Sequence, residues 1–325
     1  MLGDLIKRPR RLRRNASVRE LVRDTHVQLS HLIQPYFLKD GKGSEPITGF
    51  SGVCRLGVDL VSRQVESDLE KGLRNFLFFA HSTKKDSQGT EAWNPEGLIP
   101  TTLSTIKKRF GDSVLLFTDV CLCPFTSHGH CGVVKGEEIV NDASVEQLAK
   151  MAVCHAQAGA DFVAPSDMMD GRVRAIRHAL DRQGYQQVGV LAYTAKYASS
   201  YYGPFREALD SSPQFSDRSS YQMDFRNARA ALQELSLDLE EGADIVMVKP
   251  ALPYLDIIAQ FREHSAVPVA AYCVSAEYQM VKLLVREGLA EERKLVLENL
   301  SAITRAGAQI IVTYHASEIA RGGWL

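Results

Sequence analysis

The chain has 325 residues, 45% of them hydrophobic and 24% charged, with a formal net charge of -1 at pH 7. This composition is typical of a globular protein with a sizeable core and argues against a disordered chain. No apolar run reaches the roughly 18 residues that a membrane span needs, and the basic N-terminus lacks the apolar stretch of a secretory signal. Six cysteines in so long a chain do not indicate a secreted disulfide scaffold, so we expect a reducing cytoplasm.

A dense basic run, residues 7–14, stands near the N-terminus. A nucleic-acid patch is one interpretation, but the near-neutral charge balance and the lack of interleaved aromatic residues argue against it. We interpret the run as part of an extended arm that is held by carboxylates of another subunit or is disordered, because Pro9 and the dense charge disfavour a helix. We therefore predict an arm over residues 1–30 and one catalytic domain over residues 31–325.

Eight short β-branched and aromatic runs then alternate with helical patterns. Most runs are continuously apolar, as expected for parallel strands covered on both faces. The segments between them carry apolar stripes at helical spacing, such as Leu148 and Met151, which Gly159 follows as a C-cap. This alternation predicts an α/β fold, a (β/α)8 TIM barrel, rather than a doubly wound sheet, because no Gly-rich phosphate loop follows the first run. The runs span residues 33–38, 75–80, 114–119, 161–166, 189–194, 244–250, 267–273 and 309–315.

Polar residues close six successive runs. In a (β/α)8 barrel the catalytic groups lie at the C-terminal ends of the strands. Solvation alone does not account for this regularity, so we expect the side chains to surround one site. They are Asp119 after the third run, Ser166 and Asp167 after the fourth, Lys196 after the fifth, Lys249 after the sixth, Ser275 after the seventh and Tyr314 after the eighth.

Two lysines, Lys196 and Lys249, end adjacent runs. At a barrel mouth, desolvation disfavours the ammonium form, and a second lysine nearby lowers the pKa further. A neutral amine forms a Schiff base with a ketone or an aldehyde. A salt bridge is the alternative for either lysine, and an aldolase with one active lysine would leave Lys196 unexplained. Two such lysines predict two carbonyl substrates, or one substrate that is held twice.

Three cysteines, Cys121, Cys123 and Cys131, follow the third run in the stretch DVCLCPFTSHGHCG. Three protein ligands would leave an open position on a tetrahedral zinc ion, whereas His128 or His130 would complete a closed site. Buried free thiols and a disulfide are further alternatives. Because the stretch lies at the predicted catalytic face, we expect an open, thiolate-rich zinc site that polarises a substrate oxygen or binds its amine.

The segment of residues 201–224 is rich in Gly, Pro and Ser. It follows Lys196, and its length predicts a long loop that covers the barrel mouth as a lid. Arg206 and Arg218 lie within it, and a guanidinium group matches the geometry of a carboxylate. Solvated surface arginines are equally common, so the sequence leaves both interpretations open.

Longer motifs around these residues are similar to one family. They are DVCLCPFTSHGHCG, APSDMMDGRV, YTAKYASSYYGPFREA, GADIVMVKPALPYLD and AAYCVSAEY. The chain resembles porphobilinogen synthase, also called 5-aminolevulinate dehydratase, from RPRRLRR near the N-terminus to TYHASEIA near the C-terminus. The resemblance implies a lyase that condenses two 5-aminolevulinate molecules to porphobilinogen with loss of two waters, a step of tetrapyrrole and heme biosynthesis.

The resemblance also implies a role for each site residue. Lys249 would form the Schiff base with the first substrate and Lys196 with the second. Cys121, Cys123 and Cys131 would hold the catalytic zinc, with water as the fourth ligand. The other positions are Ser275 and Tyr314 for the carboxylate of the first substrate, Arg206, Arg218 and Gln222 for that of the second, and Asp119, Ser166 and Asp167 for proton movement.

Two further expectations come from the family alone. Its members are usually homo-octamers in which the N-terminal arm wraps a neighbouring subunit, and this explains the basic run better than nucleic acid does. Some members bind an activating, allosteric magnesium through a glutamate at a subunit boundary, and Glu234 stands at the matching position. A lone glutamate on a helix is also typical of a solvated surface.

Several positions depart from the residues that are usual in the family. Ala276 stands where glycine is usual, in a loop expected to favour positive φ, so its methyl group is expected to shift the backbone. The departures leave open a paralogue that condenses a related amino ketone for a specialised pathway. A non-catalytic oligomer is a further hypothesis, but it predicts the loss of a Schiff-base lysine, and both lysines remain. The other departures are Ala80, Ala251, Leu252, Gln309 and His315.

Overall fold

The eight predicted runs form the eight parallel strands of one closed barrel. The computed structural model describes residues 6–325, and its barrel order is β1-β4-β5-β8-β9-β10-β11-β12, with β12 pairing back to β1. This closure confirms the predicted (β/α)8 fold and excludes the open doubly wound sheet. The bounds are β1 Leu32–Lys39, β4 Asn75–His81, β5 Leu115–Val120, β8 Phe162–Pro165, β9 Gly189–Lys196, β10 Ile245–Lys249, β11 Val269–Cys273 and β12 Ile310–Thr313.

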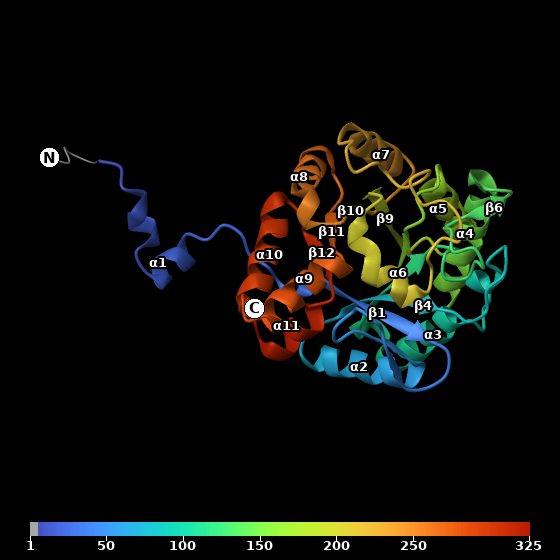
Figure 1. Cartoon of the computed structure of the whole chain (residues 1–325), viewed down its shortest axis with the longest axis horizontal. Helices are drawn as coiled ribbons and strands as arrows, with labels where there is room; N and C mark the ends of the chain where they lie inside the picture. The colour runs from blue at the N-terminus through green and yellow to red at the C-terminus, as the bar shows by residue number, and fades with distance from the viewer. Residues whose placement is uncertain (1–5) are drawn as a thin grey trace.

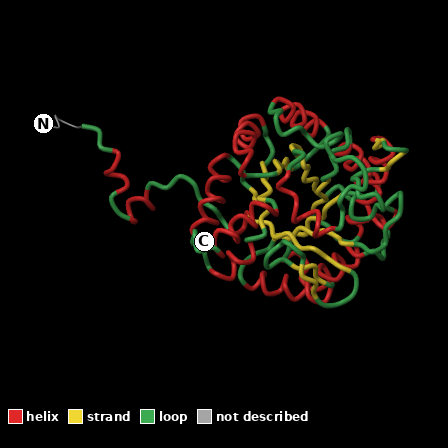
Figure 2. Tube along the Cα trace, viewed as in Figure 1, coloured by secondary structure: helices red, strands yellow, loops and turns green. Residues whose placement is uncertain are grey.

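Helices surround the strands, as Figures 1 and 2 show. The apolar stripe predicted for one of them is buried, since Leu148 and Met151 of α4 lie in the core. After this helix Gly159 has φ +104°, and a Cβ at this position would lie 2.9 Å from the Lys107 side chain. The bounds are α2 Val58–Glu70, α3 Leu98–Phe110, α4 Asn141–Gln157, α5 Arg172–Arg182, α6 Gly203–Leu209, α7 Arg229–Glu240, α8 Leu255–His264, α9 Ser275–Arg286, α10 Glu292–Ala306 and α11 Ala316–Gly322.

Two apolar layers make the core. The outer layer lies between the strands and the helices, and the inner layer fills the barrel. Because successive side chains of a strand point to opposite faces, each strand contributes to both layers, which explains its continuous apolar sequence. The inner layer is rich in aromatic residues, among them Phe37, Phe79, Tyr272 and Tyr314.

The segment predicted as a long loop over the mouth begins instead as a helix. A 3-10 turn, Ser200–Tyr202, leads into α6, which has Pro204 in its first turn. Proline is tolerated there because the N–H groups of a first turn have no partner within the helix. Helix α6 contacts β4 and α9, and only residues 210–228 beyond it are irregular.

The described part of the N-terminal segment lies apart from the barrel in Figure 1. It contains a 3-10 turn, Pro9–Arg13, and α1, Ala16–Leu21, whose N-cap Asn15 accepts a hydrogen bond from the N–H of Val18 at 2.9 Å. Most of the basic run therefore forms a 3-10 turn instead of an extended chain. A proline is tolerated there because the N–H groups at the start of a helical turn have no partner within the turn. Residues 1–5 of the predicted arm lie outside the described residues.

Two short hairpins were not predicted. Strands β2, Ser44–Pro46, and β3, Cys54–Leu56, extend the sheet beside β1, while β6, Val133–Lys135, pairs with β7, Glu138–Val140. Runs of three residues are too short for a periodic signal in the sequence. Among residues 6–325, no helix has the length and apolar character that crossing a membrane requires.

Candidate active site

Lys196 and Lys249 lie side by side at the C-terminal ends of β9 and β10. They are register partners in this parallel pair, and their exposed fractions are 5% and 3%. The Nζ of Lys249 lies 4.2 Å from the ring centre of Tyr272 and 4.6 Å from that of Phe205. Phe205 belongs to α6 and so to residues 201–224, which we call the covering segment. This segment completes an aromatic cage around the amine. The other rings of this cage belong to Tyr193 and Tyr202.

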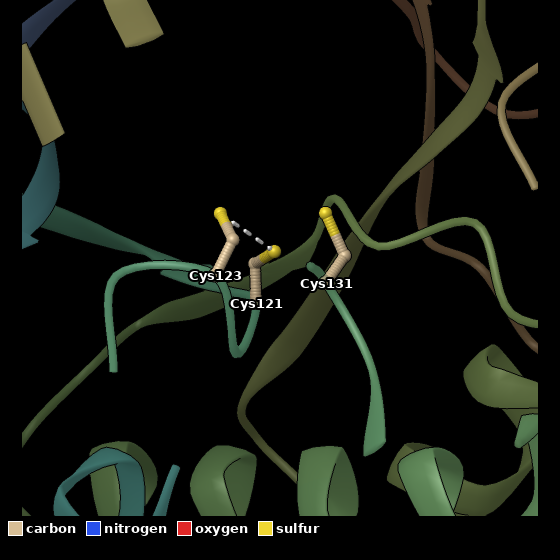
Figure 3. A group of neighbouring side chains, drawn as sticks. All are labelled: Cys121, Cys123 and Cys131. Carbon is tan, nitrogen blue, oxygen red and sulfur yellow. Dashed lines mark hydrogen bonds between the residues drawn. The ribbon is translucent and has the colours of Figure 1, made fainter. Parts of the chain in front are cut away.

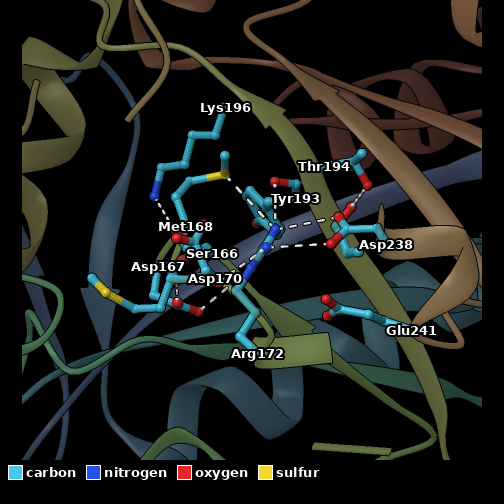
Figure 4. A network of polar contacts seen from close by, with 12 residues as sticks. Ser166, Asp167, Met168, Asp170, Arg172, Tyr193, Thr194, Lys196, Asp238 and Glu241 are labelled. Carbon is cyan, nitrogen blue, oxygen red and sulfur yellow. Dashed lines mark hydrogen bonds and ion pairs between the residues drawn. The ribbon is translucent and has the colours of Figure 1, made fainter. Parts of the chain in front are cut away.

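The two amines have different surroundings. Burial lowers the pKa of Lys249 well below the usual value for lysine, and the neighbouring Lys196 lowers it further. Aromatic faces attract an ammonium group, whereas desolvation disfavours it. The lowered pKa favours the neutral amine that attack on a carbonyl requires. Lys196 instead donates a hydrogen bond through Nζ to the backbone oxygen of Ser166, as Figure 4 shows.

Two buried carboxyl groups lie at the ends of the neighbouring strands β5 and β8. Burial raises the pKa of Asp119, at the end of β5, to about 6, while Ser166 and the two lysines oppose the shift. Burial also raises the pKa of Asp167 to about 7, and Arg172 opposes that shift. Asp119 Oδ1 and Asp167 Oδ2 have no hydrogen-bond partner. Carboxyl groups with pKa values near neutrality can both take up and release protons at physiological pH.

A buried arginine, which the sequence analysis did not single out, holds the strand end that carries Ser166 and Asp167 (Figure 4). The guanidinium of Arg172 pairs with both carboxylate oxygens of Asp238 at 3.3 Å. It also donates to the backbone oxygen of Tyr193 at 3.2 Å, and its Nε lies 4.0 Å from Asp167 Oδ2. Arg172 lies within the motif APSDMMDGRV, but only the fold brings Asp238 of α7 to it.

The three predicted cysteines converge directly after β5. The Sγ atoms of Cys121, Cys123 and Cys131 lie within 4.8 Å of one another, and those of Cys121 and Cys123 are 3.3 Å apart (Figure 3). Contacts with the other two thiols lower the pKa of Cys131 well below the usual value for a thiol, and Arg218 lowers it further, whereas burial raises the pKa of Cys121 above the usual value. Thiolates are the form in which cysteine binds a metal. This donor set therefore fits a soft, tetrahedral ion with an open fourth position.

Neither nearby histidine joins the thiols. The ring nitrogens of His130 contact Tyr221 Oη at 3.2 Å and the backbone oxygen of Phe215 at 3.0 Å. His128 accepts from the backbone N–H of His130 and lies 3.3 Å from the backbone oxygen of Ser87. This geometry argues against the closed four-ligand alternative. All six cysteines lie within the described residues and are free thiols, which excludes the disulfide alternative in this structure.

Polar groups expected to bind the first carboxylate lie at the ends of β11 and β12. The hydroxyl of Ser275 accepts from the N–H of Phe205 and donates to the backbone oxygen of Tyr201, both at 3.2 Å. The hydroxyl groups of Tyr314 and Tyr272 lie 2.9 Å apart. Ser275 thus joins the barrel to the start of the covering segment.

The covering segment carries unused donors. The side-chain amide of Gln222 is buried, and neither its oxygen nor its nitrogen has a hydrogen-bond partner. Arg218 donates to the backbone oxygens of Gly129 at 3.0 Å and Ser211 at 2.6 Å, yet its Nε is unpartnered, as is that of Arg206. Unpartnered buried donors cost free energy unless a ligand accepts from them, and a carboxylate is the matching acceptor.

Glu234 lies on α7, beside the site that the two lysines and the three thiols form. It is half-buried on α7, and burial raises the pKa of its carboxyl group. It lines a cavity of about 610 Å³ together with Gln222 and three acidic residues. The cavity therefore connects Glu234 with the covering segment. The three acidic residues are Glu137, Glu138 and Asp170.

A second group of acidic residues and a histidine lies elsewhere. Glu292, His315 and Glu318 bring their ligand atoms within 4.8 Å of one another. The Nζ of Lys282 already lies 2.5 Å from a carboxylate oxygen of each glutamate. Because this ammonium group neutralises the carboxylates, we assign no metal to the cluster.

The comparison with known proteins gives the family. The Delta-aminolevulinic acid dehydratase family model matches residues 6–322. The chain belongs to this family. A Delta-aminolevulinic acid dehydratase of Methanothermus sociabilis is 49% identical over 313 residues, which cover 96% of this chain and 97% of the relative. One of Synechococcus elongatus is 45% identical over 98% of both chains.

A solved structure agrees. The crystal structure of delta-aminolevulinic acid dehydratase (porphobilinogen synthase) of Toxoplasma gondii, in complex with the reaction product porphobilinogen, superposes with a TM-score of 0.95. It is 46% identical and covers 97% of this chain and 91% of its own. The family and the enzyme class that the motifs predicted are confirmed.

The structure accommodates the departures from the family pattern. Ala276 lies in the first turn of α9, and the described non-glycine residues with positive φ are Met168, Asp210 and Ser216. The expected backbone shift at Ala276 was therefore wrong, because a helical position accepts a methyl group. His315 packs its ring 4.4 Å from that of Tyr278, as an aromatic residue would.

Proposed function

We propose that the protein condenses two 5-aminolevulinate molecules into porphobilinogen and releases two waters. The observation that carries this proposal is the pair of buried lysines, Lys249 and Lys196, beside three converging thiols. Two amines can hold two ketones at once, which a reaction between identical substrates requires. The family, and a related structure that contains porphobilinogen, support the choice of substrate and product.

Each lysine activates one substrate. The neutral Nζ of Lys249 attacks the ketone carbon of the first 5-aminolevulinate, and the ketone oxygen leaves as water when the imine forms. Lys196 forms the second imine in the same way. The C–C and C–N bonds that then form between the substrates return both lysines as free amines, and loss of carbon-bound protons makes the pyrrole aromatic. Asp119 Oδ1 and Asp167 Oδ2, which are unpartnered, exchange these protons with the help of Ser166.

The thiolates of Cys121, Cys123 and Cys131 would hold a zinc ion. When bound, the ion supplies a Lewis acid that polarises a substrate oxygen or binds its amine. Since these thiolates must stay reduced, we also propose a reducing compartment such as the cytoplasm.

Two groups of polar residues recognise the substrate carboxylates. Ser275 and Tyr314 bind the carboxylate of the first substrate beside Lys249. The second carboxylate binds between the guanidinium groups of Arg206 and Arg218 and the amide of Gln222, whose unpartnered atoms support this assignment.

Two proposals concern the assembly. The arm, predicted over residues 1–30, carries exposed apolar side chains such as Leu21, 83% exposed, among its arginines, so we propose that it binds a second copy in a homo-octamer. Glu234 would contribute to an allosteric magnesium site in the acidic cavity. Light scattering and porphobilinogen formation, measured on full-length protein and on a variant without residues 1–24, each with and without magnesium, test both proposals. An arm variant with an unchanged oligomer, or an oligomer and activity that ignore magnesium, would overturn the respective proposal.

The test of the activity is porphobilinogen formation by reduced, purified protein with zinc and then with a strong chelator. We expect product to disappear on chelation and to return when zinc is added. The same assay on related amino ketones tests the paralogue hypothesis. Faster turnover of one of these compounds, with none of 5-aminolevulinate by folded, zinc-loaded protein, would replace our proposal with that hypothesis.

A further inference from the structure

The carboxyl group of Glu277 is almost fully enclosed, and its oxygens accept only from backbone groups. Glu277 is the third residue of α9 and is 1% exposed. It accepts hydrogen bonds from the N–H of Val274 at 2.5 Å, of Leu252 at 2.6 Å and of Ala251 at 3.4 Å. The first contact is ordinary capping of its own helix. The other two cross to the loop that follows β10.

The contacts to Leu252 and Ala251 connect the ends of β10 and β11 beyond the last paired residues of these strands. The paired residues of β10 and β11 end at Val248 and Ala271. Lys249 is the next residue of β10, and it stands two positions before Ala251. Ser275 stands two positions before Glu277. The carboxylate of Glu277 therefore takes the place of ladder hydrogen bonds between the two loops that carry these side chains.

The backbone of Lys249 is held from the opposite side as well. Its carbonyl oxygen accepts from the N–H of Tyr197 at 3.1 Å and from the hydroxyl of Tyr202 at 3.2 Å. Together with the contacts of Glu277 to the loop after β10, these hydrogen bonds hold the backbone on both sides of Lys249. Burial raises the pKa of Glu277 to about 7, while the N–H groups of Leu252, Val274 and Ala251 oppose this shift. In the ionised form, each hydrogen bond to the charged acceptor is stronger than a neutral one.

We propose that Glu277 is a positioning residue that holds the Lys249 amine where it can attack the first substrate. Glu277 touches neither substrate nor amine and acts through the backbone of residues 250–252. The proposal rests on the proposed Schiff-base role of Lys249. It predicts that loss of the carboxylate weakens imine formation at Lys249 and spares Lys196, whose loop Glu277 does not contact.

Borohydride trapping on the zinc-loaded, full-length protein tests this prediction. The probe is 4-oxopentanoate, which lacks the substrate amine and so stops at the imine, and peptide mass spectrometry measures trapping at each lysine. In Glu277→Gln one half of the side chain becomes an N–H donor that faces other N–H groups. We expect trapping at Lys249 and the kcat for porphobilinogen formation to fall by up to about 100-fold, while trapping at Lys196 stays near that of the unmodified protein.

Asp68→Asn is the matched control, because Asp68 is also a fully buried carboxylate but bonds Tyr36 and Ser317 away from the lysines. It should lower stability without changing the ratio of trapping at the two lysines. Equal loss at both lysines in Glu277→Gln, or unchanged trapping at Lys249, overturns the inference. If Glu277→Gln does not fold, Glu277→Asp replaces it, because this variant keeps the charge but has a shorter side chain. Its trapping should also fall at Lys249 and not at Lys196. No trapping at Lys249 in the unmodified protein would instead overturn the proposed role of the lysine.

Discussion

The strand ends and the segment that covers them differ in how their side chains are held. Lys196 and Lys249 extend directly from paired strands of a closed sheet. Arg206, Arg218 and Gln222 come from α6 and an irregular stretch that includes two non-glycine residues with positive φ. The first region offers nucleophiles in a fixed geometry, whereas the second offers unpartnered donors. This difference teaches that the proposed bond-making groups lie on the rigid scaffold, whereas the groups proposed to bind the second carboxylate lie on the segment that covers it.

Removal of a strand-end amine should have the largest effect. In Lys249→Ala we expect porphobilinogen formation to fall by at least about 10⁴-fold, because the Lys249 amine contacts all four rings of that cage and Lys196 contacts only that of Tyr193. The assay is product formation together with borohydride trapping. Lys282→Ala is the control, since Lys282 also lies over an aromatic ring, at 5.1 Å from the centre of Tyr278, but its Nζ pairs with Glu292 and Glu318. Comparable rates for the two variants would contradict the role of Lys249.

A thiol of the strand-end region should rank next. Cys123→Ala leaves two sulfur ligands, so we expect zinc affinity and activity to fall by about 100-fold or more. Metal content after dialysis and activity against added zinc measure the two effects. Cys154→Ala removes a buried thiol outside the cluster and should keep its zinc. Stoichiometric zinc and full activity in Cys123→Ala would contradict the role of Cys123 as a zinc ligand.

The covering segment should affect binding more than chemistry. Arg218→Gln removes a charge-assisted contact worth about 1.5–3 kcal/mol, so we expect KM to rise about 10-fold to 100-fold with a smaller change in kcat. Arg226→Gln is the matched control, because Arg226 is exposed and pairs only with neighbouring Asp224. A fall in kcat with an unchanged KM would move Arg218 from recognition to chemistry.

The smallest expected effect is on the stability of the barrel, which should depend on pH through a buried histidine. Burial lowers the pKa of His155 to about 3, and its Nδ1 lies 3.0 Å from Thr118 Oγ1 on β5. The unfolded chain takes up a proton below the usual histidine pKa near 6.5, and the folded protein does not, so this stabilising contribution is present above pH 6.5 and is lost as pH falls toward 3. The loss approaches about 1.4 kcal/mol per pH unit.

Denaturant unfolding between pH 7 and 5 measures this slope. His155→Gln should remove it, whereas His264→Gln, at an exposed position of α8, should not. An equally steep slope in both variants would assign the effect to other groups. KM should not follow the slope, because His155 lies on the outer face of the barrel, away from the covering segment.

Much of the barrel was predictable because its signals are local. The eight strands are continuously apolar, and each ends at a polar residue or leads into one, so both the fold and the shared face of the site follow from the pattern. Short hairpins such as β6–β7, and the helix α6, were missed because three to seven residues carry little periodicity. The expected loop at Ala276 was wrong for a similar reason, since α9 begins at Ser275 without a side-chain hydroxyl or carboxyl at its N-cap, Val274.

The sequence by itself determined the barrel, the order of polar residues at its mouth, the two lysines and the three thiols, because strand pattern and residue spacing are written in consecutive positions. Only the tertiary structure decided which groups oppose one another across the chain. It brought Asp238 to Arg172, turned His128 and His130 away from the thiols, and set Glu277 between two strand ends. The physical reason is that burial and hydrogen-bond partners depend on contacts between distant segments, and these contacts set the pKa values and the reach of each side chain.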